Sequence, residues 1–216
     1  MSRTQRLNEL FEEWEQRRPE EAERMCRDGI VCEENYKSAD PKLLFIAKEP
    51  NHPEGPGFDF REAFCREVRY PFAIRLCEWA YGAWNGFPPL SAVDEVDRLE
   101  VMRSISFMNL KKVGGAGSAD YDEIQSVTNR DKCFLRREIE IIDPDVIIGG
   151  VGNSSLWSVL FPEIAFQNCG FDIPVACVGG VGVIDFYHPV YRVPRAMSYC
   201  LLGRVFQSDE FRRLLS

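Results

Sequence analysis

Two short segments hold most of the side chains that could carry out acid–base or anion chemistry. The first runs "LLFIAKEPNH", in which five apolar residues are followed at once by Lys48 and Glu49 and then by His52. The second, "HPVYR", begins with His188, the only other histidine of the chain. A carboxylate can stabilise a developing cation, and an imidazole can donate or accept a proton near neutral pH. The two segments together favour a catalytic site.

A third segment, "SFMNLKK", brings an amide and two cations. The amide of Asn109 carries both a donor and an acceptor, so it can pair with a planar polar group in two orientations. Lys111 and Lys112 add two positive charges next to it.

Alternating strand and helix patterns must position these segments. The run "LLFIA" has the length and apolar character of a parallel strand that is covered on both faces. Further strands are predicted at about 104–109, within "DPDVIIGGVGNSS", and in "IPVACVGG" and "GVIDFYHPVYR", with helices at about 60–84, at 130–142 and from about 154. The pattern predicts an α/β fold, a three-layer α/β/α sandwich with a central, mostly parallel sheet of four to five strands.

The N-terminal 40 residues read as helical and acidic. Leu7, Leu10, Phe11 and Trp14 recur at helical spacing, and Pro19 is typical of the first turn of a second helix that runs to about residue 28. Residues 1–40 hold eleven acidic and seven basic side chains. We expect one domain over residues 1–216, with residues 1–40 as an acidic N-terminal helical extension.

The polar segments are expected to meet at one edge of the sheet. Ligands of open parallel sheets bind beyond the carboxyl ends of the strands. Residues 48–52, 109–112, 149–154 and 188–192 all follow predicted strands, and both histidines fall among them. The sequence therefore predicts a single site at this edge.

Composition limits the function classes. A net charge of −8 argues against a protein that coats nucleic acid without specificity. The absence of an apolar run of about 18 residues, and of an apolar stretch near the N-terminus, predicts a cytoplasmic protein without a membrane anchor. Eight cysteines without a Cys-x-x-Cys pair predict reduced thiols; an alternative is a zinc or iron–sulfur site from some of Cys26, Cys32, Cys65 and Cys77. We expect a monomer without a small-molecule cofactor or metal.

The order of these segments resembles the uracil-DNA glycosylase superfamily. "AKEPNH" is similar to its first motif, and "GPG" at residues 55–57 is similar to the loop that follows. "SFMNLKK" is similar to the middle strand that ends in a base-reading asparagine. "HPVYR" is similar to the second motif, whose loop wedges into the duplex. The resemblance covers about residues 41–195.

The resemblance implies a DNA glycosylase that flips out a pyrimidine and hydrolyses its N-glycosidic bond, leaving an abasic site. Glu49 would stabilise the cationic sugar, and His188 would donate a hydrogen bond where charge accumulates. The expected base-binding residues are Asn109, Asn51, Phe58 and Phe60. The amide of Asn109 would match uracil or thymine in one orientation and cytosine in the other. The expected DNA-binding residues are Lys48, His52, Lys111, Lys112, Pro189, Tyr191 and Arg192.

The chain departs from the commonest first motif of the superfamily at three positions. Glu49 stands where aspartate is usual, Lys48 where glutamine is usual and Asn51 where tyrosine is usual. Tyrosine at that position excludes pyrimidines with a substituent at carbon 5, so the shorter asparagine favours such a base. Hydroxymethylcytosine or its glucosylated form in phage DNA would fit, with a role in antiviral defence, and uracil is the alternative target.

Two other functions are compatible with the sequence. The glycine-rich turn "GGVGNSS", from Gly149 to Ser155, could cradle a phosphate of a nucleotide on its backbone N–H groups. The same fold could also serve as a non-catalytic module that binds DNA or a protein, with the acidic residues 1–40 as the partner surface.

Overall fold

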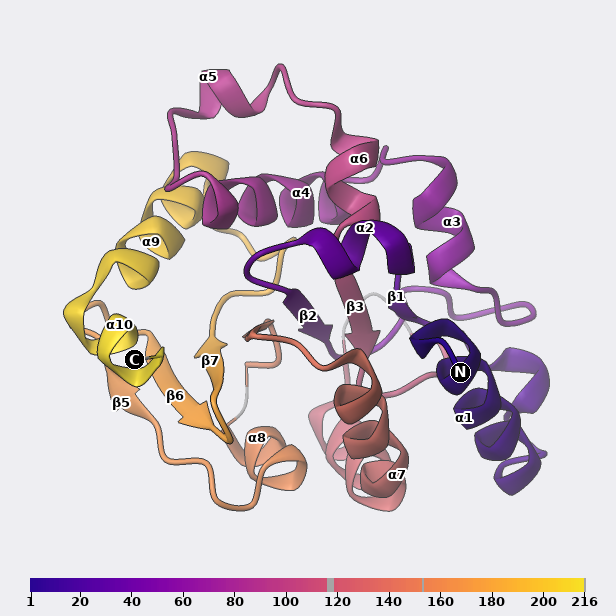
Figure 1. The fold of residues 1–216 in the computed structure, drawn as a ribbon. Coiled ribbons are helices and arrows are strands. Elements are labelled where there is room, and N and C mark those ends of the chain that lie inside the picture. The colour runs from indigo at the N-terminus through magenta and orange to yellow at the C-terminus, as the bar shows by residue number, and fades with distance from the viewer. Residues whose placement is uncertain (116–118, 153, 216) are drawn as a thin grey trace.

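A computed structural model describes residues 1–115, 119–152 and 154–215 of the chain (Figure 1). Its centre is a seven-stranded mixed sheet in the order β1-β3-β2-β4-β7-β6-β5. The strands are β1 (Gly29–Ile30), β2 (Leu43–Ala47), β3 (Ser106–Asn109), β4 (Val146–Gly149), β5 (Gln167–Asn168), β6 (Pro174–Val178) and β7 (Val181–Asp185).

The α/β class expected from the sequence is confirmed, but the sheet is larger and more mixed than expected. The four strands β3, β2, β4 and β7 are parallel neighbours. Antiparallel pairing occurs toward the two edges, where β1 pairs with β3 on one side and β6 pairs with β7 and β5 on the other. β6 and β7 are joined by Gly179 and Gly180, both with positive φ, which is the chemistry of a tight hairpin turn. β1 and β5 have two residues each, too few to produce a periodic pattern.

Helices pack on both faces of the sheet (Figure 1). Alternate residues of β2 point to opposite sides: Leu43 and Phe45 join one apolar cluster, and Leu44 and Ile46 join the other. The helices are α1 (Arg3–Arg17), α2 (Glu33–Ser38), α3 (Phe60–Arg66), α4 (Pro71–Trp84), α5 (Leu90–Val93), α6 (Arg98–Arg103), α7 (Tyr121–Ile142), α8 (Ser154–Leu160), α9 (Arg195–Gln207) and α10 (Asp209–Leu215). None of them, within the described residues, is long and apolar enough to cross a bilayer.

The first 40 residues belong to the same core as the sheet. Leu7, Leu10, Phe11 and Trp14 of α1 are at most 1% exposed and share a cluster with residues of α7. β1 pairs with β3, which brings the N-terminal segment to the edge of the sheet. The residues expected to bind a ligand at the end of β3 therefore lie beside N-terminal residues.

The helix expected over residues 19–28 is wrong. Only Ala22–Arg24 form a single 3₁₀ turn. The following backbone groups are used in tertiary pairing, because the N–H of Cys26 donates to the carbonyl of Lys112 and that of Arg27 donates to the carbonyl of Phe58. In a helix, these N–H groups would instead donate to carbonyl groups of the preceding turn. The segment instead lines the loop that follows β2.

Two other helices differ from expectation at their boundaries. The single helix expected at about 60–84 is divided into α3 and α4. α7 begins at Tyr121, nine residues earlier than expected from the apolar spacing, because Asp120 caps it by accepting the N–H groups of Asp122 and Glu123. This early start carries Tyr121 and Glu123 to the end of β2.

Candidate active site at the strand ends

Backbone hydrogen bonds continue beyond the strands and hold the segments at the ends of four strands side by side. The N–H of Lys111 donates to the carbonyl of Lys48 at 2.8 Å, and that of Gly150 donates to the carbonyl of Ile46 at 2.8 Å. On the other side of β4, the N–H of Phe186 donates to the carbonyl of Gly149 at 2.9 Å. The segments after β3, β2, β4 and β7 therefore follow one another along one edge.

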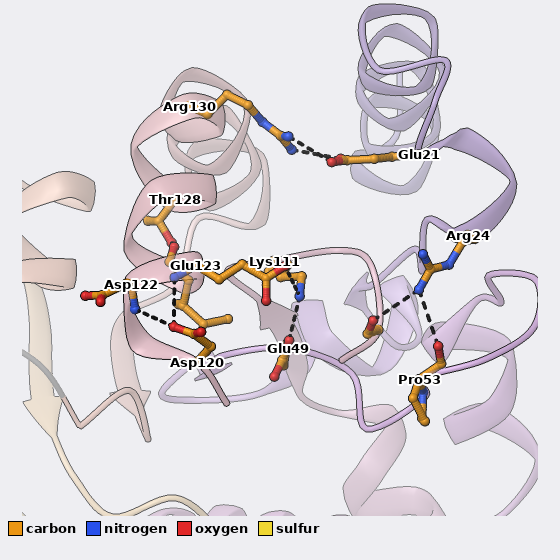
Figure 2. A network of polar contacts seen from close by, with 12 residues as sticks. Glu21, Arg24, Glu49, Pro53, Lys111, Asp120, Asp122, Glu123, Thr128 and Arg130 are labelled. Carbon is orange, nitrogen blue, oxygen red and sulfur yellow. Dashed lines mark hydrogen bonds and ion pairs between the residues drawn. The ribbon is translucent and has the colours of Figure 1, made fainter. Parts of the chain in front are cut away.

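Glu49 lies in a small charge network in which the side chains of Glu49 and Lys111 are buried and that of Glu123 is exposed (Figure 2). Its carboxylate is 2.9 Å from the ammonium of Lys111, and only 7% of the Glu49 side chain is exposed. The same ammonium is 2.9 Å from a carboxylate oxygen of Glu123, in the first turn of α7. Two carboxylates and one ammonium leave the network with one net negative charge.

Lys111 is held as a cation. Burial alone would lower the pKa of its ammonium, but the hydrogen bonds to Glu123 and Glu49 outweigh burial, and the pKa lies above its usual value. A protonated amine is not a nucleophile. Lys111 thus restrains the Glu49 carboxylate, and its 7% exposure leaves little surface for the phosphate contact expected from the sequence.

The backbone of the 113–115 segment covers Glu49. A Cβ atom added at Gly115 would lie 2.0 Å from a carboxylate oxygen of Glu49, so only glycine permits this approach. Gly115 also donates its N–H to the carbonyl of Pro50 and forms a bridge with Asn51. Arg24 reaches the same loop through the carbonyl of Pro53 (Figure 2). The loop after β2 is therefore fixed from two sides.

His188 is neutral at physiological pH. Burial, and then the positive charge of Lys48, lower the pKa of its imidazole to about 4. Its Nδ1 accepts the N–H of Val190 at 3.3 Å, which places the ring proton on Nε2. The imidazole can therefore donate a hydrogen bond from Nε2 without carrying a charge.

An aromatic group packs beneath His188. The ring of Phe72 lies 5.6 Å from the imidazole and 5.3 Å from the ring of Phe107 on β3. Phe72 and Phe107, with Pro189 and Ala47, line an apolar cavity of about 10 Å³, which is smaller than a nucleobase. Larger surface hollows, of about 590 Å³ and 410 Å³, lie elsewhere, one beside Trp84 and one beside residues 87–90. We give the small cavity more weight because Pro189, which lines it, follows His188 directly, and Phe72 contacts the imidazole.

Glu49 and His188 occupy neighbouring parts of this edge. In the part of the chain that the structure describes, no hydrogen bond or ion pair joins them. Lys48 relates the two groups, because it directly precedes Glu49 in the chain and its positive charge contributes to the lowered pKa of His188. The two expected catalytic groups are brought to one edge but are not in contact.

Asn109 and Lys112 are core residues. The N–H of Asn109 donates to Asp28 at 2.8 Å, its side-chain amide lies 3.4 Å from the same carboxylate oxygen, and only 1% of the residue is exposed. The ammonium of Lys112 is 2.5 Å from Asp28 and 2.7 Å from Glu138. With 3% exposure, Lys112 cannot contact a phosphate, which corrects that expectation.

The buried triad of Asp28, Lys112 and Glu138 has a balanced charge. Burial raises the pKa of the Glu138 carboxyl well above its usual value, which favours its protonated form. Lys112 then compensates Asp28 alone, while its ammonium also lies 5.4 Å from the ring centre of Phe11 and 5.5 Å from that of Trp14. The triad anchors α1, α7 and the end of β3.

The segment after β2 contains three residues that were expected to bind the base, and each of them is at least partly exposed. Phe58 is 38% exposed and contacts the imidazole of His52 edge-on at 5.5 Å. Phe60 is half-buried, 4.5 Å from Phe58 and 5.3 Å from Phe107. Asn51 is exposed. Aromatic packing connects Phe58 through Phe60 to the strand that ends in Asn109.

The second motif forms an exposed loop after β7. Tyr191 is 59% exposed and stacks on Tyr187 at 5.5 Å, and its N–H donates to the carbonyl of His188. Arg192 is exposed, whereas Pro189 is buried. Tyr191 and Arg192 are thus free to meet a ligand, and Pro189 closes the apolar cavity instead of contacting DNA.

Close packing accounts for the glycines of the 149–155 turn. A Cβ at Gly149 would lie 2.2 Å from the ring of Trp157, and one at Gly150 would lie 2.6 Å from the Cα of His188. Residue 153 lies outside the described residues. The proposed phosphate cradle is therefore not needed to explain the described glycines.

All eight cysteines are unpaired thiols. Across residues 1–115, 119–152 and 154–215, no three histidine, cysteine, aspartate or glutamate side chains gather as a metal site would require. Comparison with protein-family models and with curated proteins finds no match for this chain.

Several residues of the site were missed from the sequence. Phe72 was assigned only to a helix, Glu123 was assigned to no element, and Asp28 was assigned to the end of a helix that does not form. Only the N-cap pattern of Asp120 before Tyr121 could have indicated that Glu123 faces the site.

Proposed function

We propose that the protein is a monofunctional DNA glycosylase that extrudes a pyrimidine and hydrolyses its N-glycosidic bond. The observation that carries this proposal is the parallel order β3-β2-β4-β7, which gathers three motif segments at one edge of the sheet. These segments are separated by about 60 and 80 residues in the sequence. The motif order and a three-layer α/β/α arrangement resemble those of the uracil-DNA glycosylase superfamily.

Cleavage places positive charge on the sugar, and the carboxylate of Glu49 would stabilise it. Lys111 and Gly115 fix the carboxylate in one position, so little reorganisation is needed when the charge develops. Glu123 shares Lys111, which keeps the network at one net negative charge. The network therefore supplies an oriented anion.

The departing base takes the bonding electrons, and His188 would donate to the oxygen on which negative charge accumulates. The Nε2–H tautomer favoured by the Val190 contact offers this donor. A water oxygen forms the new bond to C1′, the bond from C1′ to the base nitrogen breaks, and the proton released by water balances the charge on the base. The products are an abasic site and a free base.

The extruded base would stack near Phe72, which contacts both His188 and Phe107. Asn109 is fixed by Asp28 with its amide nitrogen toward that carboxylate, and at 1% exposure it would support the wall of the site from the core side instead of reading the base. The exposed Asn51 leaves room beside carbon 5. Our preferred target is a 5-substituted pyrimidine such as glucosylated hydroxymethylcytosine, with uracil as the alternative.

The test is a panel of matched oligonucleotides that carry uracil, a thymine mismatch, hydroxymethylcytosine or glucosylated hydroxymethylcytosine. Free base is measured by mass spectrometry, and abasic sites are measured by alkaline cleavage of the same samples. We expect release of one pyrimidine class with equal amounts of free base and abasic site. Release from none of them, with DNA binding retained, would favour a non-catalytic module.

A further inference from the structure

Three tyrosines with exposed rings surround the strand ends. Tyr70 precedes the first turn of α4 and is 58% exposed, Tyr121 begins α7 and is 42% exposed, and Tyr191 follows His188 and is 59% exposed. A single exposed aromatic side chain is ordinary on a protein surface, so the feature that distinguishes these three is their common position next to the segments of the candidate site. Their rings are therefore candidates for contact with a flat partner.

Each tyrosine has a neighbouring cation. The guanidinium carbon of Arg69 lies 4.9 Å from the ring centre of Tyr70, and an Nη2–H donates to the hydroxyl at 2.7 Å. The ammonium of Lys48 lies 4.9 Å from the ring centre of Tyr121 and donates to its hydroxyl at 3.2 Å. These contacts restrain the rings and leave a large part of each exposed.

The third ring is restrained by stacking. Tyr191 stacks on Tyr187 with an angle of 5° between the rings, and the exposed Arg192 follows it in the chain. An exposed aromatic ring beside a positive charge is the arrangement that binds a nucleotide, because the base stacks on the ring and the cation meets the phosphate.

All three tyrosines are tied to the proposed catalytic groups. Lys48, the partner of Tyr121, precedes Glu49. Phe72, two residues after Tyr70, contacts the ring of His188. The N–H of Tyr191 donates to the carbonyl of His188. A strand that contacted the three rings would therefore pass over the candidate active site.

We propose that Tyr70, Tyr121 and Tyr191, with their neighbouring cations, bind single-stranded DNA on both sides of the nucleotide in the site. This inference rests on the proposed function and names the form of its substrate. Stacking requires bases whose faces are free, which a duplex does not offer. The net charge of −8 and the contact of Glu67 with Arg69 at 3.5 Å make stacking, not charge, the main source of affinity.

The experiment measures binding without excision. Fluorescence anisotropy follows a labelled 15-residue oligothymidine, the same strand in a duplex, and the corresponding oligouridine RNA. We expect single-stranded DNA to bind at least about tenfold more tightly than the duplex. With three cations in contact, the logarithm of affinity should fall with the logarithm of salt concentration with a slope of about −2.

Matched variants assign the binding to the rings. Tyr70→Ala, Tyr121→Ala and Tyr191→Ala should each weaken binding roughly tenfold, and Tyr121→Phe should retain most of the affinity because the ring remains. Phe171→Ala removes another exposed ring, 41% exposed in the turn between β5 and β6, and should change nothing. Circular dichroism confirms that each variant is folded.

Equal affinity for single strand and duplex, preference for the RNA, or unchanged binding by the three alanine variants would overturn the inference. The proposed function fails separately. Single-strand binding without base release from any panel substrate would support the single-strand-binding surface and reject the glycosylase activity. Release from duplex DNA without single-strand binding would support the glycosylase activity and reject the surface.

Discussion

Adjacent residues of one type have opposite environments in this protein, and Lys111 and Lys112 are the clearest case. Both follow Asn109 and both were expected to meet phosphates. Alternation at the strand end directs Lys111 toward Glu49 and Lys112 into the buried triad. The sequence alone cannot reveal this difference, because the partners Asp28 and Glu138 are about 80 and 26 residues away in the chain.

Replacing Lys112 tests the buried triad. Lys112→Met leaves the Asp28 carboxylate buried without its cationic partner, and we expect a loss of about 3–5 kcal/mol in the free energy of unfolding. Lys132→Met removes an exposed lysine of α7 and should change the stability by less than about 0.5 kcal/mol. Urea denaturation measures both. A small effect at Lys112 would mean that the triad does not hold the fold.

The pKa of His188 predicts a pH dependence of stability. The imidazole has a pKa of about 4 in the fold and about 6.5 when unfolded, so the unfolded chain binds more protons between these values. Its contribution is complete above pH 6.5 and is lost as pH falls toward 4. Wild type should lose about 2 kcal/mol more than His188→Gln between pH 7.5 and pH 5.

Urea denaturation of both proteins at the two pH values gives the difference directly, since other titrating groups are common to both. Equal losses in wild type and variant would contradict the buried, neutral histidine on which the donor role depends.

At the scale of the elements, the start of α7 positions two residues of the site. Asp120→Ala removes its N-cap and should cost about 1 kcal/mol of stability. It should also slow base excision about tenfold, because Tyr121 and Glu123 lose their fixed positions. Asp97→Ala removes the equivalent cap of α6 and should cost similar stability without slowing excision.

Unfolding curves and single-turnover excision on the same preparations separate the two effects. If both cap variants slow excision equally, the loss reflects stability alone and α7 has no special role in the site.

The strands that carry the site were predictable, and the strands at the edges were not. The apolar runs at 43–47 and 146–149 are continuous because both faces of these strands are covered, and such runs stand out in a sequence. β1 pairs through Gly29 and Ile30 only, so its existence depends on β3 and not on its own residues. Residues 19–28, just before β1, do not form the expected helix for a similar reason, because their backbone groups pair with distant segments.

At the scale of the whole molecule, the fold brings together motifs that are far apart in the sequence. N-terminal residues support the site from the core side, because Asp28 holds Asn109 and Lys112 at the end of β3. The meeting of residues 48–52 and 188–192 at one edge follows from the rule for parallel sheets and was predictable. The restraint of Glu49 by Lys111 and Gly115 was not, because it depends on side-chain directions across three segments.

The central claim is that the Glu49 carboxylate acts at a cationic sugar. Single-turnover excision by Glu49→Gln, on the substrate that wild type processes best, tests it most directly, with Glu54→Gln as the matched control from the exposed part of the same loop. We expect Glu49→Gln to bind DNA normally and to excise at least about a hundredfold more slowly, and Glu54→Gln to match wild type. Excision by Glu49→Gln at the wild-type rate would contradict the account.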